Sequence, residues 1–280
     1  MFMADNIMSI ENEFNASMKF SHGYQNRINR EQWDLLQKSY EAFRAKNNKK
    51  ELIPKIIHQI WLGENPPENC QNFVSKLKQI HPDWEYKLWN NDNIDFELEN
   101  RDVFDQASNL GQKSDILRCE ILKKYGGIYL DLDFFIVKPL DELRGCDFFA
   151  GIVYDQKPNL SNSIIGSSPN NPLISELLNF RKGVLSGDAM QIIDSTGPHH
   201  TTRAFFKCLP SMDTIVAFPN SYFYPLPNFP RDRVLGGKME SYFQANTICC
   251  HLWHCSWMKK KSSENFLSRF IKRIKSKIPF

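Results

Sequence analysis

The stretch YGGIYLDLDFF, residues 125–135, decides the fold class of this 280-residue chain. Two glycines end a helix-like segment, and the apolar, strand-like segment that follows carries Asp131 and Asp133. In a strand, residues i and i+2 point to the same side, about 6.6 Å apart. Tyr129, Asp131 and Asp133 are therefore expected to share one face of a strand that runs over residues 129–140.

Two ionised carboxylates on one side of an apolar strand repel each other and lose hydration when they are buried. A divalent cation at the carboxyl end of the strand would compensate them, because hard carboxylate oxygens are the ligands that magnesium and manganese prefer. The carboxyl ends of strands are also where α/β sheets bind ligands. The alternative for an isolated D-x-D pattern is a solvated strand end whose acids pair with lysines.

The segments before this stretch alternate between strand and helix patterns. Residues 53–61 and 85–91 are rich in β-forming residues, and residues 72–81 between them have a helical pattern. Another helix is expected to start at Ser114 as its N-cap and to end at the glycines 126–127. Strand, helix and strand in succession predict an α/β fold.

The segments after the acidic stretch are less regular. Short β segments are expected within residues 145–172, and a helix over residues 171–185. Residues 196–207, TGPHHTTRAFFK, are expected to form turns. Their adjacent histidines, His199 and His200, are either structural or close to an acceptor substrate.

Composition divides the chain into three regions. Residues 1–50 are polar, with one apolar helical face between residues 33 and 43, and are expected to form a helical N-terminal extension. Residues 51–258 form the main domain. Residues 259–280 are expected to form a basic amphipathic helix that lies on an anionic membrane surface or packs back on the domain.

Several function classes are disfavoured by bulk properties and missing motifs. A formal net charge of +3 is too small to indicate a nucleic-acid partner. Seven cysteines without a C-x-x-C pair or regular spacing argue against a zinc site and a disulfide framework, and favour a reducing, cytoplasmic compartment. Glycine-rich phosphate loops and the H-E-x-x-H pattern are missing from the sequence, which argues against a kinase, a dehydrogenase or a metallohydrolase. Neither a signal peptide nor a transmembrane helix is predicted.

The motifs around the acidic pair resemble those of glycosyltransferase family 32, whose sugar-binding region contains a DXD motif. S-D-x-L-R at residues 114–118 precedes Y-G-G-x-Y-x-D-x-D at residues 125–133. Upstream, IPKIIHQIWLG at 53–63 and HPDWEYKLWNN at 81–91 resemble the first strand of the family and its second element. HLWHCSW at 251–257 resembles the C-terminal His…Ser-Trp. These matches occur in the order of the family.

The resemblance implies a single GT-A-like domain, with a central mixed sheet flanked by helices. It also implies a retaining hexosyltransferase that uses Mn²⁺ or Mg²⁺ and a nucleotide-sugar donor, with a UDP-sugar favoured. The acceptor would be a hydroxyl of a glycan, with a lipid-linked oligosaccharide of bacterial capsule or lipopolysaccharide synthesis favoured. Such an enzyme would work at the inner face of the membrane, held peripherally by residues 259–280.

The resemblance also assigns roles to the acidic pair and to two histidines. Asp133 would bind the metal directly, and Asp131 would hold the donor or reach the metal. His251 occupies the histidine position of the family and would be a further metal or diphosphate ligand. His254 competes for this role, because the family more often has a small residue there.

Other substrate-binding roles follow from the same resemblance. Asp115 and Arg118 lie at i and i+3 on one helix face. They would grip hydroxyls of the donor sugar, and a surface salt bridge is the alternative. Trp61 would stack on the nucleobase and Tyr129 would contact the donor, unless either packs in the core. Two further candidates would close over the diphosphate: Ser256 and Trp257.

Two other functions stay open at this point. A catalytically decayed protein would bind a glycan or a nucleotide sugar without turning it over. An effector that glycosylates a host protein would share the chemistry of a glycan-building enzyme. The intact D-x-D pair argues against decay, and metal-dependent binding without turnover would favour it.

Overall fold

The computed structural model describes residues 13–19, 21–26, 28–46, 50–66, 68–153, 155–180, 188–227 and 239–254. The strands are β1 (Ile56–Ile60), β2 (Glu85–Trp89), β3 (Gly127–Leu130), β4 (Phe134–Ile136), β5 (Phe148–Ile152), β6 (Leu160–Ser167), β7 (Ile215–Phe218) and β8 (Cys249–His251). The helices are α2 (His22–Gln25), α3 (Arg30–Ala45), α4 (Glu68–Ile80), α5 (Arg101–Gln106), α6 (Leu110–Tyr125), α7 (Pro172–Leu177), α8 (Ala189–Ser195) and α9 (Pro198–Cys208). Three short 3-10 helices cover Asp141–Gly145, Leu209–Ser211 and Met239–Tyr242.

A six-stranded mixed sheet forms the centre of the molecule, in the order β2-β1-β3-β6-β5-β7. Strand β1 pairs in parallel with β2 and β3, as the strand–helix–strand pattern predicted. Strand β6 runs antiparallel to both β3 and β5, and β7 returns parallel to β5. The predicted α/β fold with a central mixed sheet is confirmed.

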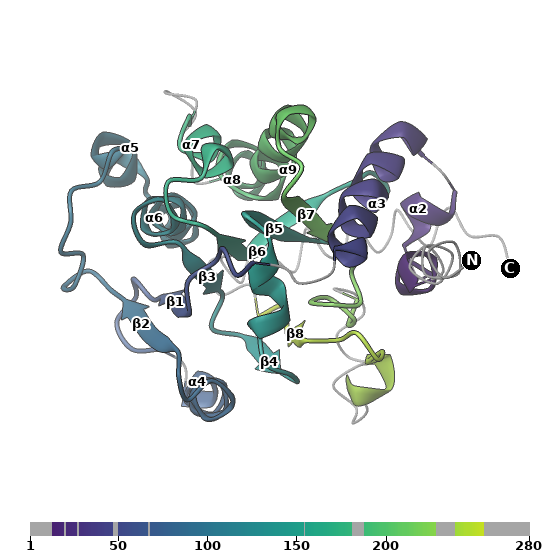
Figure 1. Cartoon of the computed structure of the whole chain (residues 1–280). Helices are drawn as coiled ribbons and strands as arrows, with labels where there is room; N and C mark the ends of the chain where they lie inside the picture. The colour runs from purple at the N-terminus through teal and green to yellow at the C-terminus, as the bar shows by residue number, and fades with distance from the viewer. Residues whose placement is uncertain are drawn as a thin grey trace, which may run out of the picture.

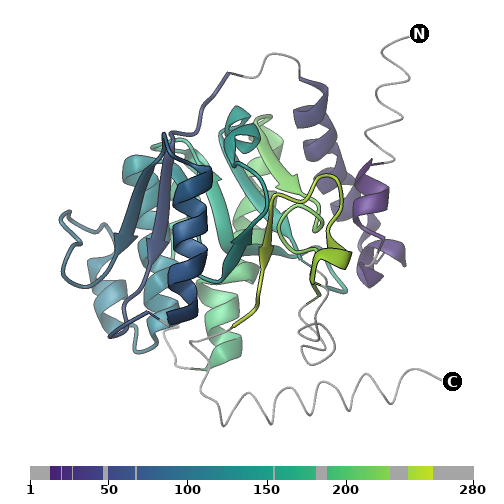
Figure 2. The same ribbon diagram turned by 90° about the horizontal axis from the view of Figure 1, so that it is seen from below.

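Helices cover both faces of this sheet (Figure 1). Helices α5 to α9 lie on one side, while α4 and the small sheet formed by β4 and β8 lie on the other (Figures 1 and 2). Helix α3 packs beside the edge strand β7, where the rings of Tyr40 and Phe43 contact Phe218. The described part of the expected N-terminal extension is thus helical, and the domain boundary at residue 50 stays a prediction.

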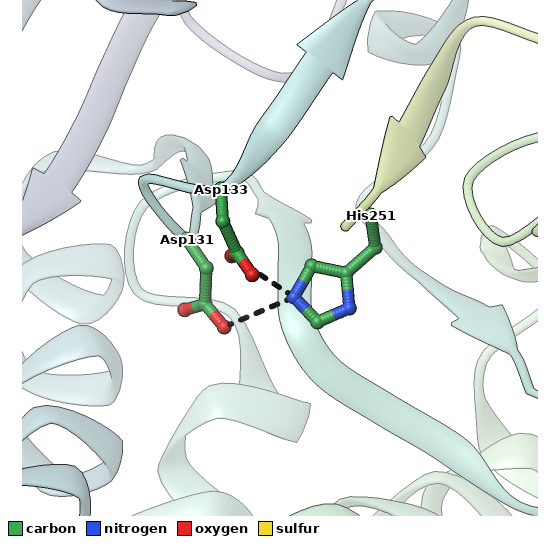
Figure 3. Close-up of side chains that lie close together, drawn as sticks. All are labelled: Asp131, Asp133 and His251. Carbon is green, nitrogen blue, oxygen red and sulfur yellow. Dashed lines mark ion pairs between the residues drawn. The ribbon is translucent and has the colours of Figure 1, made fainter. Parts of the chain in front are cut away.

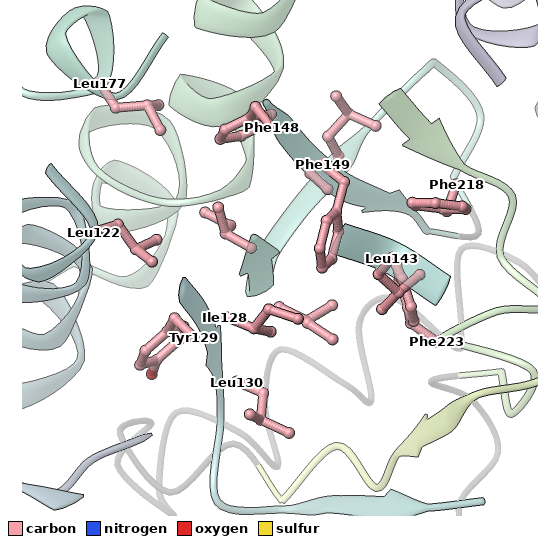
Figure 4. Close-up of a cluster of buried hydrophobic side chains, with 14 of the residues drawn as sticks. Leu122, Ile128, Tyr129, Leu130, Leu143, Phe148, Phe149, Leu177, Phe218 and Phe223 are labelled. Atoms are coloured by element: carbon pink, nitrogen blue, oxygen red, sulfur yellow. The ribbon is translucent and has the colours of Figure 1, made fainter. Parts of the chain in front are cut away.

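The core is continuous across the sheet (Figure 4). All residues of β3, β5, β6 and β7 are buried, because both faces of these strands are covered. Close packing imposes local sequence requirements: a Cβ at Gly166 would lie 2.0 Å from the ring of Phe149. Burial of a phenylalanine such as Phe149 stabilises the fold by roughly 2–3 kcal/mol.

The prediction of one strand over residues 129–140 is wrong. Strand β3 ends at Leu130, β4 begins at Phe134, and the two belong to different sheets. The backbone N–H of Asp131 still donates to Ser163 O at 2.9 Å, and the chain then turns out of the sheet. Asp131 and Asp133 therefore lie in the turn between β3 and β4, and they do not share a strand face.

Two other local predictions are also wrong. Helix α6 begins at Leu110 rather than at Ser114, because Asn109 caps it by accepting from the N–H of Gly111 at 2.7 Å. Residues 196–207 do not form turns throughout, since most of them belong to α9. Pro198 occupies the first turn of that helix, where its missing N–H costs nothing.

The helices expected over residues 171–185 and 259–280 fall partly or wholly outside the described residues. The helix expected over 171–185 is shorter in the structure: α7 ends at Leu177, residues 178–180 are not helical, and residues 181–187 lie outside the described part of the chain. Residues 259–280, expected to form the basic helix, also lie outside it. Among the described residues, none of the helices is long and apolar enough to cross a bilayer. No disulfide joins the described cysteines.

Candidate functional site

Asp131, Asp133 and His251 converge where the chain leaves the central sheet (Figure 3). Strand β8 pairs antiparallel with β4, and this register places His251 opposite Phe134. His251 Nε2 lies 3.1 Å from Asp133 Oδ1 and 3.8 Å from Asp131 Oδ2. Pairing of two short strands therefore brings a histidine from the end of the chain to the acidic pair.

The Asp133 carboxylate is the more strongly held of the two. Burial disfavours its charged form, but His251 and the backbone N–H of His254 outweigh this and lower the pKa of Asp133 to about 2. The His254 N–H donates to Asp133 Oδ2 at 2.7 Å. A left-handed backbone at Trp253, with φ of +58°, turns the chain so that this bond can form. Asp133 is thus ionised at neutral pH.

Aromatic rings hold the imidazole of His251 in place. Phe134 stacks on it with ring centroids 4.7 Å apart, and Trp253 lies edge-on at 4.4 Å. Nε2 is thereby directed at the carboxylates, whereas Nδ1 is buried and has no partner among the described residues. The side chain of His254 is exposed, and only its backbone reaches Asp133. Of the two competing histidines, His251 has the geometry of a ligand.

Asp131 connects the acidic pair to the buried charges of α6. Its Oδ1 accepts a 2.6 Å hydrogen bond from the Tyr129 hydroxyl and lies 3.7 Å from Arg118 Nη2. Burial raises the pKa of Asp131, partly offset by Arg118 and His251. The guanidinium of Arg118 lies 4.4 Å from the ring centroid of Tyr129. Tyr129 is buried and acts on Asp131 through its hydroxyl.

Asp115 and Arg118 form a buried ion pair rather than a surface salt bridge. Arg118 Nη2 lies 3.1 Å from Asp115 Oδ1, and the two side chains are only 6% and 10% exposed. Asp115 also accepts from Asn162 Nδ2 at 2.8 Å and from Thr196 Oγ1 at 2.9 Å. Burial raises the pKa of Asp115 to about 6, although Arg118, Thr196 and Asn162 each favour its charged form.

The acidic pair and His251 suit a hard divalent cation. One ligand atom from each of the three residues lies within 4.8 Å of the others. Two carboxylate oxygens and one imidazole nitrogen are a donor set that manganese or magnesium accepts, with further positions left for ligand oxygens. Three carboxylates face one guanidinium and one imidazole here, so added positive charge would relieve the repulsion between Asp131 and Asp133.

The structure does not bring every predicted residue to this cluster. Trp61 follows the last residue of β1, is half-buried, and has an indole N–H without a partner among the described residues. Its contact with a nucleobase stays a prediction. His200 is buried with Nε2 at 2.8 Å from Leu177 O, which is a structural role, whereas His199 is half-buried beside Asp194. Ser256 and Trp257 lie outside the described residues.

Sequence reasoning missed Asn162 and Thr196. Asn162 lies within β6, and Thr196 precedes the glycine before α9. The only available signals were a polar residue in a buried strand and the TGP tripeptide. Neither signal shows that its residue contacts Asp115, because those contacts join distant parts of the chain.

Comparison with known proteins places the acidic pair in a recognised family region. Residues 67–149 match the family "Glycosyltransferase sugar-binding region containing DXD motif". The match includes Asp115, Arg118 and the D-x-D of Asp131 and Asp133. It therefore covers the helix and the turn that carry most of the cluster.

Curated relatives match about half of the chain. An uncharacterized glycosyltransferase, L373 of Acanthamoeba polyphaga mimivirus, is 35% identical over 158 residues, which are 52% of this chain and 62% of that protein. Inositol phosphoceramide mannosyltransferase 1 of Schizosaccharomyces pombe is 36% identical over 137 residues, 46% of this chain and 42% of that protein. The chain thus spans less than two thirds of the length of either relative.

A solved structure confirms the GT-A-like fold. The catalytic domain of alpha-toxin from Clostridium novyi aligns with a TM-score of 0.51 at 10% identity, over 95% of this chain and 92% of that one. At this identity the likeness concerns the fold alone. Residues 67–149 thus match the sugar-binding region, with its DXD motif, of a glycosyltransferase family, and the relatives that share this part of the chain include mannosyltransferases.

Proposed function

We propose that this protein is a metal-dependent glycosyltransferase that moves a hexose from a nucleotide sugar to a hydroxyl of a glycan or glycolipid. The observation that carries this proposal is the convergence of Asp131, Asp133 and His251 beside the buried pair Asp115–Arg118. A cation compensates this excess of carboxylates best, and a bound cation in turn attracts an anionic ligand such as a diphosphate.

Different residues would bind the diphosphate and the sugar of the donor. Asp133, His251 and Asp131 would hold the cation, which when bound supplies positive charge that stabilises the departing diphosphate. Asp115 and Arg118 would orient the sugar, with the carboxylate accepting from a hydroxyl and the guanidinium donating to one. Because Arg118 also lies 3.7 Å from Asp131, the two halves share one charge network.

The proposed nucleotide rests on a residue of this chain, whereas the proposed sugar and acceptor rest on a relative. The proposed stacking on Trp61 favours a UDP-sugar, whereas the name of the fission yeast relative favours mannose as the sugar. The same name favours a lipid acceptor, which agrees with a lipid-linked oligosaccharide. Synthesis of a bacterial surface polysaccharide, such as capsule or lipopolysaccharide, is the setting that we propose for this reaction.

We propose that the anomeric configuration is retained. Product from an α-linked donor is then α-linked, which the anomeric coupling in proton NMR spectra distinguishes from a β-linked product. A covalent glycosyl-enzyme trapped on a carboxylate of this chain would contradict the route that we favour. In that route the departing diphosphate guides the acceptor from the same face.

Residues 259–280 are proposed to hold the enzyme peripherally at the cytoplasmic face of a membrane. Their sequence combines an apolar stripe with lysines and arginines, and each basic residue near an anionic surface adds about 1 kcal/mol. The chain should sediment with vesicles that contain phosphatidylserine and stay in solution with neutral vesicles. A chain that ends at residue 258 and stays folded should lose this difference.

A donor-hydrolysis screen tests the proposed activity without knowledge of the acceptor. The wild-type chain is incubated with Mn²⁺ and a panel of UDP- and GDP-sugars, and release of nucleotide is measured. We expect release from one donor, lost with a chelator and with Asp133→Asn. Metal-dependent binding of UDP or GDP without release, in the presence of simple glycans and glycolipids, would favour a decayed binding protein. Absence of both binding and release would overturn the proposal.

A further inference from the structure

The turn between α8 and α9, formed by Thr196 and Gly197 after Ser195 ends α8, is hydrogen-bonded to the helix that carries Asp115. Gln112 on α6 donates to Ser195 Oγ at 3.3 Å. Thr196 Oγ1 donates to Asp115 Oδ2 at 2.9 Å. The turn and the last residue of α8 therefore contact two successive inward-facing positions of α6.

Asn162 fastens the same turn from the sheet side. Its Nδ2 donates to Asp115 Oδ1 at 2.8 Å and lies 3.5 Å from Thr196 O, while its own carbonyl accepts from Arg118 Nη1. Asn162 and Thr196 are 7% and 2% exposed. Asn162 thus joins the carboxylate and the turn through its side-chain amide, and the guanidinium through its main-chain carbonyl.

The partners of Asp115 leave little capacity for a substrate. An ionised carboxylate has roughly four acceptor positions. Among the described residues, Asn162 and Arg118 occupy Oδ1, and Thr196 occupies one position on Oδ2. The remaining position is on Oδ2, next to the Thr196 hydroxyl.

We propose that Thr196 and Asn162 are positioning residues that set Asp115 to accept one hydroxyl of the donor sugar through Oδ2. Selection of the sugar then depends on the turn between α8 and α9 as well as on α6. This inference rests on the proposed function. It adds that the match between site and sugar comes from residues outside the D-x-D region.

The negative charge of the Asp115 carboxylate sets the direction in which the Thr196 hydroxyl donates. Its proton has two acceptors within reach, Asp115 Oδ2 at 2.9 Å and Ile192 O at 3.4 Å. The ionised oxygen is the stronger and nearer acceptor. The threonine therefore orients Oδ2, and a side chain of equal shape without a hydroxyl would leave the carboxylate held through Oδ1 alone.

Three variants separate this role from a merely structural one. Thr196→Val removes the hydroxyl and keeps the shape, and Thr196→Ser keeps the hydroxyl. Thr201→Val is the matched control, because Thr201 is also buried and, among the described residues, its hydroxyl donates only to the carbonyl of Gly197, the N-cap of α9, at 3.3 Å. Calorimetry with Mn²⁺ measures binding of UDP and GDP, and of UDP-glucose, UDP-galactose and GDP-mannose, to each chain.

We expect Thr196→Val to weaken binding of the preferred sugar nucleotide by about tenfold to a hundredfold. Binding of the matching nucleoside diphosphate should stay within about twofold, because that part of the donor does not touch Asp115. Thr196→Ser and Thr201→Val should resemble the wild type. Monodeoxy donors, each of which lacks one hydroxyl of the sugar, extend the test. Only the donor that lacks the hydroxyl bound by Asp115 should bind equally to the wild type and to Thr196→Val.

Each other result contradicts a stated part of the inference. Equal loss of nucleotide and sugar nucleotide would make Thr196 a general support of the fold, and no loss of either would remove its role altogether. Several deoxy donors that abolish the difference would contradict the single hydroxyl. A wild-type chain that binds none of the probes would instead overturn the proposed function.

Discussion

His58 and His251 are both buried histidines at strands, yet the structure treats their rings in opposite ways. His58 on β1 has two partners: Trp89 Nε1 donates to its Nδ1 at 3.1 Å, and its Nε2 lies 2.9 Å from Gly126 O. His251 has Nε2 facing two carboxylates and Nδ1 without a partner among the described residues.

The difference separates a structural histidine from a ligand histidine. Burial lowers the pKa of His58 to about 4, so its ring is neutral and its two hydrogen bonds fix the tautomer. His251 instead offers one nitrogen to a cluster of negative charge, which is how metal-ligating histidines are placed. Burial alone does not distinguish the two roles, whereas the partners of each nitrogen do.

The acidic partner of His251 should have the largest effect. Asp133→Asn removes a charge from the proposed metal site, and we expect nucleotide release to fall roughly a hundredfold to a thousandfold. A chelator added to the wild type should give the same loss. Asp95→Asn, at an exposed aspartate, is the control that keeps full activity. Unchanged release by Asp133→Asn would make the cluster structural, like the surroundings of His58.

His58 should govern stability and its dependence on pH. Its folded pKa of about 4 lies below the ordinary value of 6.5, so below pH 6.5 the unfolded chain binds a proton that the folded chain does not. Stability is therefore lost as the pH falls from 6.5 through 4, by about 2 kcal/mol between pH 7.5 and pH 5. Urea unfolding at both pH values should show this loss in the wild type, and less of it in His58→Gln. Identical slopes would contradict a neutral buried ring.

His251→Gln, compared with His58→Gln, tests whether the two histidines have different roles. We expect nucleotide release to fall about tenfold to a hundredfold at limiting Mn²⁺, with partial recovery as Mn²⁺ is raised. His58→Gln should keep wild-type release at neutral pH. The contrast between the two histidines would be lost if the His58 variant required more Mn²⁺ and the His251 variant did not.

Tyr129→Phe should give the smallest effect, because it removes one hydrogen bond to Asp131 and no charge. The Mn²⁺ concentration for half-maximal activity should rise about threefold to tenfold. Tyr40→Phe is the matched control. Tyr40 lies on α3, and its buried hydroxyl is hydrogen-bonded to the hydroxyl of Tyr222 at 3.1 Å rather than to a residue of the metal site. An equal rise in both variants would point to a loss of stability rather than a weaker site.

Local patterns predicted the central elements and failed at their ends. The helical face between residues 33 and 43 and the β-forming runs of β1 and β2 were found where the sequence placed them. The strand over 129–140 was overextended, because period-two alternation continues through Asp133 although the chain leaves the sheet after Leu130. Residues 196–207 were interpreted as turns, yet only Thr196 and Gly197 form one, and Pro198 opens α9.

The sequence by itself determined the family resemblance, the fold class, the acidic pair, and the i, i+3 pair Asp115 and Arg118 on α6. These features lie within short stretches, so local spacing and motif order carry them. Only the tertiary structure decided that His251, rather than His254, faces the carboxylates, and that Thr196 and Asn162 hold Asp115. Those contacts join residues far apart in the chain, and they depend on strand pairing and helix packing that no local pattern encodes.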